Sequence, residues 1–435
     1  MNKLKETKIL GFPLWMFLVL NAIMIFLAIN DWMLTDMIGA LAFSLVVGTL
    51  LGWIGNHIPV WNTWFGGGML FTSLAAAAMN TFNLVGENTK AALNTFNGST
   101  GFLNLYILVL ITGAVLSVDR KMLLKSFAGY IPTIIGGIVG ALGLAAIVGA
   151  IMGIGAIEAM TTFAIPIMGG GNGAGIQPMS VMWSSATGGE AASWFATAFA
   201  IISLGNLVAV FFSALLNKLG QMKPELTGNG QLMKDDDNAT SKDEEVKPTV
   251  ADYATGLALG LVCYSVADLY SKHISIINNH LDLGFTIHTF AFMVILMAII
   301  NIANILPANV KAGAKAMQGF FVKFMSFPLM ITVGIGTNLT DYAKVFTNPA
   351  NLLVIIATVI GAMLGTFIIG NLFHFYPVEG MLTAGLCMAN GGGSGDVQCL
   401  GAANRMEMMS YAQISSRIGG AIMLVVASFF FGRFL

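Results

Sequence analysis

Charged residues are scarce in this sequence of 435 residues. Asp, Glu, Lys and Arg make up 9% of it, whereas hydrophobic residues make up 56%. Soluble domains carry about 25% charged residues, so this chain cannot cover a water-facing surface, and a soluble globular enzyme is excluded. The 20 basic and 21 acidic residues nearly cancel. No overall positive field is therefore available for binding nucleic acid or an anionic membrane surface.

Cysteine is also rare. Its three residues, Cys263, Cys387 and Cys399, have no metal-binding spacing and form no disulfide framework, and their simplest interpretation is small apolar packing residues. No cluster of His, Asp and Glu, no Cys-x-x-Cys motif and no nucleophile elbow has the spacing that catalysis needs. The sequence therefore predicts a protein that is not an enzyme and has no organic cofactor.

Long stretches without charge are the main feature that the sequence does have. A membrane-spanning helix needs about 20 mostly apolar residues, and residues 37–86 contain no Asp, Glu, Lys or Arg. We therefore expect an all-α polytopic membrane protein whose first span is retained rather than cleaved. The eleven expected spans are residues 11–30, 34–56, 62–82, 101–118, 126–153, 190–216, 251–271, 283–306, 319–337, 350–374 and 410–432.

Basic residues are distributed unevenly between the expected loops. Fourteen of the 20 Lys and Arg residues, Arg405 among them, fall on the side of the N-terminal tail, and four fall on the other side. Because loops rich in Lys and Arg stay in the cytoplasm, the N-terminus is predicted to be inside and the C-terminus outside. The polar, mixed-charge residues 217–250 are then a cytoplasmic linker, interpreted as a flexible tether, with a regulatory segment as the alternative.

The linker divides the chain into two parts of similar organisation. After a tail and first span in residues 1–33, residues 34–216 and 251–435 each contain five expected spans. An odd number of crossings gives the two parts opposite orientations, as in the inverted repeats of many secondary transporters. Each part also carries a Gly-rich motif before its last span, which strengthens this interpretation.

The two Gly-rich motifs lie in stretches too apolar for a soluble loop and too rich in Gly for a helix. Irregular backbone at membrane depth must be surrounded by protein or line a wet cavity, so residues 156–178 and 377–403 are predicted to be re-entrant hairpins. Entering from opposite faces, they would meet near the midplane, where transporters bind their substrates, and Gly would let backbone N–H groups turn toward an anion. Glycines that only pack helices together are the alternative.

The C-terminal stretch is the most specific part of the sequence. It reads Cys387-Met388-Ala389-Asn390-Gly391-Gly392-Gly393-Ser394-Gly395-Asp396, then Asn404-Arg405-Met406, then Tyr411-Ala412-Gln413-Ile414-Ser415-Ser416-Arg417-Ile418-Gly419-Gly420. Together with residues 166–175, it resembles the bacterial 2-hydroxycarboxylate transporter family, which includes citrate/sodium and malate/sodium symporters and citrate or malate/lactate exchangers. The likeness covers essentially the whole chain. It implies a homodimer in the bacterial inner membrane with an elevator movement, in which a scaffold domain holds the dimer and a core domain carries both hairpins.

Arg417 is the principal candidate for binding substrate. It lies within the last expected span, where a charged residue costs at least about 2.5–3.5 kcal/mol and therefore needs an ionic partner. A planar guanidinium binds a carboxylate through two N–H groups, and a buried Asp or Glu is the alternative partner. The resemblance implies that Arg417 binds a substrate carboxylate. It implies further substrate contacts from Asn172, Gly173, Gly393 and Ser394.

A second group of polar residues in the same stretch suits a hard cation. Such a cation takes oxygen ligands, and unwound backbone near half-helix ends supplies carbonyl groups. The resemblance implies sodium binding by Asn390, Ser394, Asp396 and Ser416, with the backbone carbonyls of Cys387 and Met388. Asp396 has two alternatives, as the cap of a half-helix or as a proton carrier. Glu158 and Glu379, which begin the two hairpins, are candidates for gating or capping.

One departure from the family bears on the substrate. In its citrate/sodium symporters the second turn reads Asn-Arg-Gly-Gly-Ser-Gly-Asp, and Gly391 stands here in place of that Arg. A third carboxylate would then lack a cationic partner, which favours a dicarboxylate such as malate over citrate. Sodium-coupled symport is the leading hypothesis. A malate or citrate/lactate exchanger, a proton-coupled symporter and an anion channel are the alternatives.

Overall fold

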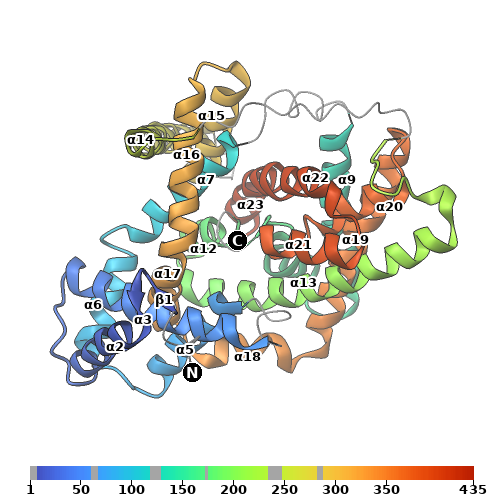
Figure 1. Cartoon of the computed structure of the whole chain (residues 1–435). Coiled ribbons are helices and arrows are strands. Elements are labelled where there is room, and N and C mark those ends of the chain that lie inside the picture. The colour runs from blue at the N-terminus through green and yellow to red at the C-terminus, as the bar shows by residue number, and fades with distance from the viewer. Residues whose placement is uncertain (1–6, 60–66, 118–128, 172–174, 234–246, 282–287) are drawn as a thin grey trace. The chain divides into compact units, whose positions relative to one another are not determined.

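The computed structural model describes the chain except for residues 1–6, 60–66, 118–128, 172–174, 234–246 and 282–287. The described residues are mostly helical, and their two short strands, β1 (Lys8–Ile9) and β2 (Phe12–Pro13), form an antiparallel pair in which Ile9 pairs with Phe12 (Figure 1). Eight helical segments of the described residues are long and apolar enough to cross a membrane. The structure thus agrees with the prediction of a polytopic membrane protein.

The chain forms two compact units. The first comprises residues Met1–Tyr106, Phe195–Thr197 and Phe320–Lys344. Its elements are β1, β2, α2 (Leu14–Ile29), α3 (Met37–His57), α5 (Gly67–Thr81), α6 (Glu87–Asn97), the start of α7 (Phe102–Leu116), η4 (Phe321–Met325), α17 (Ser326–Ile335) and most of α18 (Leu339–Thr347). Small residues let these helices touch, because neither Gly55 nor Gly68 has room for a Cβ atom where α3 meets α5.

The second unit comprises residues Ile107–Trp194, Ala198–Gly319 and Val345–Leu435. Its helices before the central polar segment are most of α7, α9 (Tyr130–Ile151), α10 (Ala156–Glu158), η1 (Ala159–Ala164), α11 (Ile165–Ile167), α12 (Gln177–Thr187) and most of α13 (Ala191–Met222). After it come η3 (Pro224–Leu226), α14 (Val250–Leu281), α15 (Thr289–Ala303), α16 (Ala308–Phe320), α19 (Pro349–Leu372), α20 (Pro377–Gly380), η5 (Met381–Leu386), α21 (Gly393–Ala402), η6 (Met406–Met408), α22 (Met409–Ile414), η7 (Ser415–Gly419) and α23 (Gly420–Phe434). This unit contains both Gly-rich motifs.

The helical segments fall where the sequence predicts spans. The eight long ones are α3, α6 with α7, α9, α13, most of α14, α16 through α17, α19, and η6 through α23. The other three expected spans coincide with α2, α5 and α15, which have 16, 15 and 15 residues. These three are shorter than the roughly 20 residues of a full crossing, so the number of eleven spans stays a prediction.

The crossing of α9 and α19 organises the second unit (Figure 1). Gly136 and Gly140 of α9 lie directly against Gly365 and Gly361 of α19, and a Cβ atom on any of the four would collide with the opposite helix. Such contact between backbones is typical of small residues spaced four apart in membrane helices. Since α9 and α19 immediately precede the two Gly-rich motifs, this contact fixes where both motifs begin.

Both Gly-rich motifs form a helix, a turn and a second helix. In the first, α10, η1 and α11 lead to the turn and α12 leads away from it, whereas in the second α20 and η5 lead to the turn and α21 leads away. The predicted first hairpin, residues 156–178, ends within α12 rather than at a helix end. Residues after Pro178 continue α12 without a helix-breaking residue until Gly188, which ends the helix in a left-handed conformation with φ of 72°.

The predicted linker, residues 217–250, is not a simple tether throughout. Its first residues continue α13 to Met222, and η3 follows. The next residues attach to the start of the second hairpin, where Leu232 O accepts a hydrogen bond of 2.9 Å from Tyr376 N and Met233 pairs with Phe375. A polar composition did not predict this attachment, because the contacts use mainly backbone groups.

Candidate functional site

The two Gly-rich turns meet each other within the second unit. A Cβ atom on Gly171 would lie 2.9 Å from Gly392 Cα, and both residues have positive φ, 116° and 84°. Only Gly adopts such angles without strain. Beside them, Gly170 lies against the backbone of Ser416 and Gly420, with no space for a side chain. The structure thus brings the two turns together, whereas their entry from opposite faces of a membrane stays a prediction.

A buried carboxylate lies next to these turns. Asp396, in the first turn of α21, is fully buried, and its Oδ1 accepts a hydrogen bond of 3.0 Å from Asn390 Nδ2. Ser416 Oγ of η7 lies 3.0 and 2.9 Å from its two carboxylate oxygens and 3.1 Å from Cys387 O. We call Asn390, Asp396, Ser416 and the Cys387 carbonyl the Asp396 cluster. It unites four of the six residues predicted to bind sodium.

The hydroxyl of Ser416 has more acceptor oxygens around it than it has hydrogens to donate. A serine hydroxyl carries one hydrogen, yet three acceptor oxygens surround Ser416 Oγ within 3.1 Å. Burying a carboxylate is costly, and the nearby charge of Arg417 offsets part of that cost without an ion pair among the described residues. A hard monovalent cation removes both problems, because it coordinates several oxygens and neutralises Asp396. The Asp396 cluster therefore has the chemistry of a cation site.

The remaining predicted residues fall in different places. Met388 is buried beside the cluster, and its Sδ borders Gly419. Gly393 begins α21 and faces open space, since a Cβ atom there would have no neighbour within 4 Å. Ser394 lies in the first turn of α21, next to Gly393. Asn172 and Gly173 lie outside the described residues.

Arg417 follows Ser416 in η7, a π-helical turn. Its Nη1 donates a hydrogen bond of 2.5 Å to Ser117 Oγ. Among the described residues, no Asp or Glu lies within ion-pair distance of Arg417, although its charge and that of Asp396 attract each other. A half-buried guanidinium that donates to a neutral hydroxyl has N–H groups left for a carboxylate. Short π-helical turns are frequent at functional sites, and this one joins the candidate substrate and sodium residues directly.

Asn206, which holds the second turn, was not among the residues selected from the sequence. From α13, its Oδ1 accepts a hydrogen bond of 3.2 Å from Gly391 N, and its Nδ2 donates one of 2.7 Å to Gln398 Oε1. Gly395 has no space for a Cβ atom because Asn206 occupies it. A lone Asn in an apolar span carries no motif. Its position in the last expected span of residues 34–216 was the one indication that the sequence offered.

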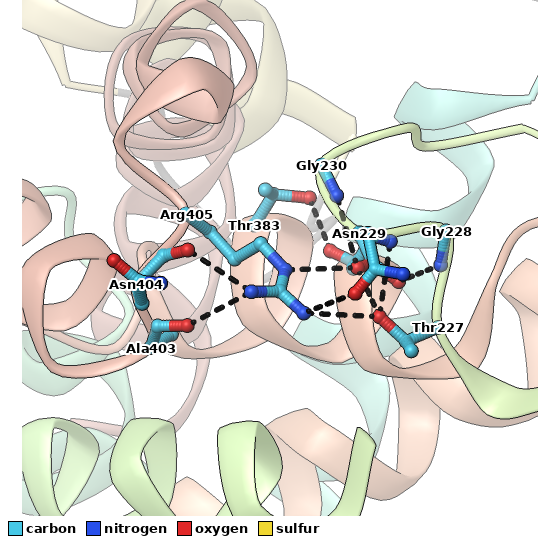
Figure 2. Close-up of polar contacts among 9 residues, drawn as sticks. Thr227, Gly228, Asn229, Gly230, Thr383, Ala403, Asn404 and Arg405 are labelled. Atoms are coloured by element: carbon cyan, nitrogen blue, oxygen red, sulfur yellow. Dashed lines mark hydrogen bonds and ion pairs between the residues drawn. The ribbon is translucent and has the colours of Figure 1, made fainter. Parts of the chain in front are cut away.

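An ion pair between Glu379 and Arg405 was also missed. Arg405 was counted with the cytoplasmic loops, but its side chain is 8% exposed and its Nε lies 3.2 Å from Glu379 Oε1, which is fully buried. Figure 2 shows the surrounding contacts, which reach Thr227. Glu158, the candidate at the related position of the first hairpin, is exposed. The two glutamates therefore do not have equivalent surroundings.

The chain is similar to known proteins along almost its whole length. Residues 9–429 match the 2-hydroxycarboxylate transporter family. The chain is 40% identical to a citrate/sodium symporter of Salmonella typhimurium over 99% of this chain and 96% of the relative. It is 30% identical to the Na(+)-malate symporter of Bacillus subtilis over 96% and 91%, and 29% identical to the malate transporter MleP of Lactococcus lactis over 98% of each chain. The chain therefore belongs to the 2-hydroxycarboxylate transporter family, and it is a membrane transporter of 2-hydroxycarboxylates rather than an enzyme.

Proposed function

We propose that this chain imports a 2-hydroxycarboxylate together with sodium across the bacterial inner membrane. The Asp396 cluster carries the proposal, because it gathers buried oxygen atoms of the kind that sodium needs. The names of two relatives, a citrate/sodium symporter and a Na(+)-malate symporter, support the same coupling ion. Sodium is therefore the proposed co-transported ion. Its proposed ligands are Asn390, Ser394, Asp396, Ser416 and the carbonyls of Cys387 and Met388.

Coupling follows from the short distance along the chain between the two sites. Ser416 belongs to the Asp396 cluster, and its neighbour Arg417 offers a guanidinium to a substrate carboxylate. Sodium bound at Ser416 fixes the π-helical turn and thereby the position of Arg417. By linkage, substrate held at Arg417 strengthens sodium binding by the same factor. Asn172, Gly173, Gly393 and Ser394 complete the proposed substrate site from the two hairpins.

We propose malate as the favoured substrate. Gly391 supplies no charge where the citrate pattern has Arg, and a Cβ atom would fit there, since its nearest neighbour would be Asn206 Oδ1 at 3.8 Å. A tricarboxylate would therefore leave one carboxylate unpaired. Citrate is the second candidate, because the citrate/sodium symporter is 40% identical to this chain and the Na(+)-malate symporter 30%.

The proposed mechanism is an elevator movement of a homodimer. In each subunit, eleven spans would form two inverted five-span repeats, with the N-terminus in the cytoplasm and the C-terminus outside. The contact between Gly171 and Gly392 supports this mechanism, because turns that touch can move as one body with the substrate between them. An exchanger would share the same hairpins but would not need sodium, and a channel would not need a lone Arg417.

Uptake by purified protein in liposomes tests the proposed function. Malate, citrate and lactate are offered separately, with a sodium gradient or a proton gradient imposed alone. The proposal expects malate uptake driven by sodium and not by a proton gradient. Uptake that needs internal lactate but no sodium would establish an exchanger. Preference for citrate would overturn the argument from Gly391, and single-channel currents faster than any carrier would establish a channel.

A further inference from the structure

A buried ion pair closes the base of the second hairpin (Figure 2). Glu379 lies in α20, where the incoming limb of the hairpin begins, and Arg405 follows α21, where the returning limb ends. The tip between them carries Asn390 and Asp396 of the Asp396 cluster. The ion pair thus fixes the separation of the two limbs at the end opposite to the cluster.

Residues 227–229, which follow α13, supply further hydrogen bonds to both members of this ion pair. Thr227 Oγ1 donates a hydrogen bond of 2.6 Å to Glu379 Oε1 and accepts one of 3.2 Å from Arg405 Nη2. Gly228 N donates to Glu379 Oε2 at 2.9 Å, and Asn229 Oδ1 accepts from Arg405 Nη2 at 3.2 Å. One hydroxyl group therefore serves both charges at once, as the dashed lines of Figure 2 show.

The same arginine holds the end of the returning limb. Arg405 Nη1 donates to the carbonyl oxygens of Ala403 and Asn404 at 3.3 and 3.0 Å. These carbonyls follow α21, where a helix leaves acceptors without intrahelical partners. Asn404 also has a positive φ of 52°, a conformation common just after a helix. The guanidinium thus determines where α21 stops as well as how it meets α20.

The incoming limb is a stiff connection between Glu379 and the cluster. Every residue from Pro377 to Asn390 is buried, and Thr383 Oγ1 donates a hydrogen bond of 2.7 Å to Glu379 O. Close-packed interiors transmit displacement rather than absorb it. The cluster is sensitive to such displacement, because its contacts of 2.9 to 3.1 Å leave little tolerance before a hydrogen bond or an ion contact is lost.

We propose that Glu379, Arg405 and Thr227 form a clasp that positions the two limbs so that Asn390 and Asp396 bind sodium with Ser416. The clasp residues are positioning residues and do not touch the ion or the substrate. The proposal rests on the proposed function of sodium symport. It adds that the segment after α13, which the sequence predicts to be a tether, sets the sodium affinity of the transporter.

Variants of Thr227 test the clasp without leaving a buried charge unpaired. Thr227→Val removes the shared hydroxyl at nearly constant shape, and Thr227→Ser keeps it. Loss of a group that orients metal ligands weakens metal binding about 10-fold to 100-fold, and we expect about a tenfold rise in the sodium concentration for half-maximal uptake in Thr227→Val. The substrate KM at saturating sodium stays unchanged, because bound sodium restores the geometry, and Thr227→Ser restores wild-type sodium dependence.

Glu379→Gln removes the ion pair and should raise the sodium requirement further. Asp252→Asn is the matched control, since Asp252, at the start of α14, accepts hydrogen bonds from Thr249 and Asn309, neither of which belongs to a hairpin. Any loss of stability from Asp252→Asn should leave the sodium requirement unchanged. A normal sodium requirement in correctly inserted Thr227→Val and Glu379→Gln protein, or an equal change in sodium requirement and substrate KM, would overturn the clasp.

The native cysteines give a second measurement that does not depend on sodium transport. Cys387 and Cys399 are buried in the two limbs, and Cys263 is buried in α14. We expect N-ethylmaleimide to label Cys387 and Cys399 faster in Thr227→Val and Glu379→Gln than in wild type, with Cys263 unchanged, as read by peptide mass spectrometry. Sodium-independent uptake by wild type would refute the proposed function. In that case the labelling rates by themselves would test whether the clasp holds the two limbs. Unchanged labelling, or equal acceleration at all three cysteines, would refute the clasp.

Discussion

Replacing Arg417 by Lys tests the assignment of this residue to a substrate carboxylate. Lys keeps the positive charge but loses the planar pair of N–H donors that binds a carboxylate in two places. A hydrogen bond to a charged group is worth about 1.5–3 kcal/mol, so the loss of one such bond costs about 2 kcal/mol. Since about 1.4 kcal/mol is a factor of ten in affinity, the substrate KM should rise about 30-fold.

Arg417→Ala removes the charge and both donors, and it should raise KM by several hundredfold, on the order of 4 kcal/mol or more. Ser117→Ala removes only the present neighbour of the guanidinium and should change KM much less. Arg433→Ala is the control, because Arg433 lies at the exposed end of the same terminal helix.

The assay is the initial rate of labelled malate uptake into liposomes under a fixed sodium gradient, with the amount of inserted protein measured in parallel. A KM for Arg417→Lys within about twofold of wild type, corresponding to about 0.4 kcal/mol, would refute the reasoning. A lower maximal rate at unchanged KM would also refute it, because the guanidinium would then act in a step other than substrate binding.

Three further predictions concern the turns and the ion cluster. Ser416→Ala should raise the sodium concentration for half-maximal uptake by about tenfold, measured at saturating substrate; an unchanged value would exclude Ser416 as a ligand. Gly391→Arg should increase affinity for citrate relative to malate in competition uptake, since Arg adds a cationic partner for a third carboxylate and a Cβ atom fits at this position; an unchanged ratio would contradict the specificity argument. Gly171→Ala should abolish uptake by inserted protein, because an Ala with positive φ costs about 1–2 kcal/mol and its Cβ would collide with Gly392. Gly401→Ala, which meets no neighbouring atom, is the control and should transport normally.

Much of the helical architecture could be predicted because apolar runs and membrane thickness are local properties of the sequence. The positions of α9, α13 and α19 follow from uncharged stretches alone. The Asp396 cluster was also predictable in part, because Asn390 and Asp396 lie close in the sequence and the resemblance added Ser416.

The contacts that were missed join residues far apart in the sequence. Asn206 meets Gly391 only when α13 and the second hairpin are packed together. Thr227 meets Glu379 only when the segment after α13 folds back. The burial of Arg405 was not predicted, because counting basic residues in loops assigns a charge to one side of the membrane, whereas its burial depends on a distant Glu.

The contact between α9 and α19 has a consequence for how this sequence tolerates change during evolution. Gly136, Gly140, Gly361 and Gly365 leave no atoms between the two backbones, so replacement by any larger residue must separate the helices. The outward faces of the same helices are free of this restriction, since Ile135, Val139, Leu364 and Ile368 are exposed hydrophobic residues. Substitutions that accumulate between lineages should therefore fall on the outward faces, while selection should remove substitutions at the four glycines.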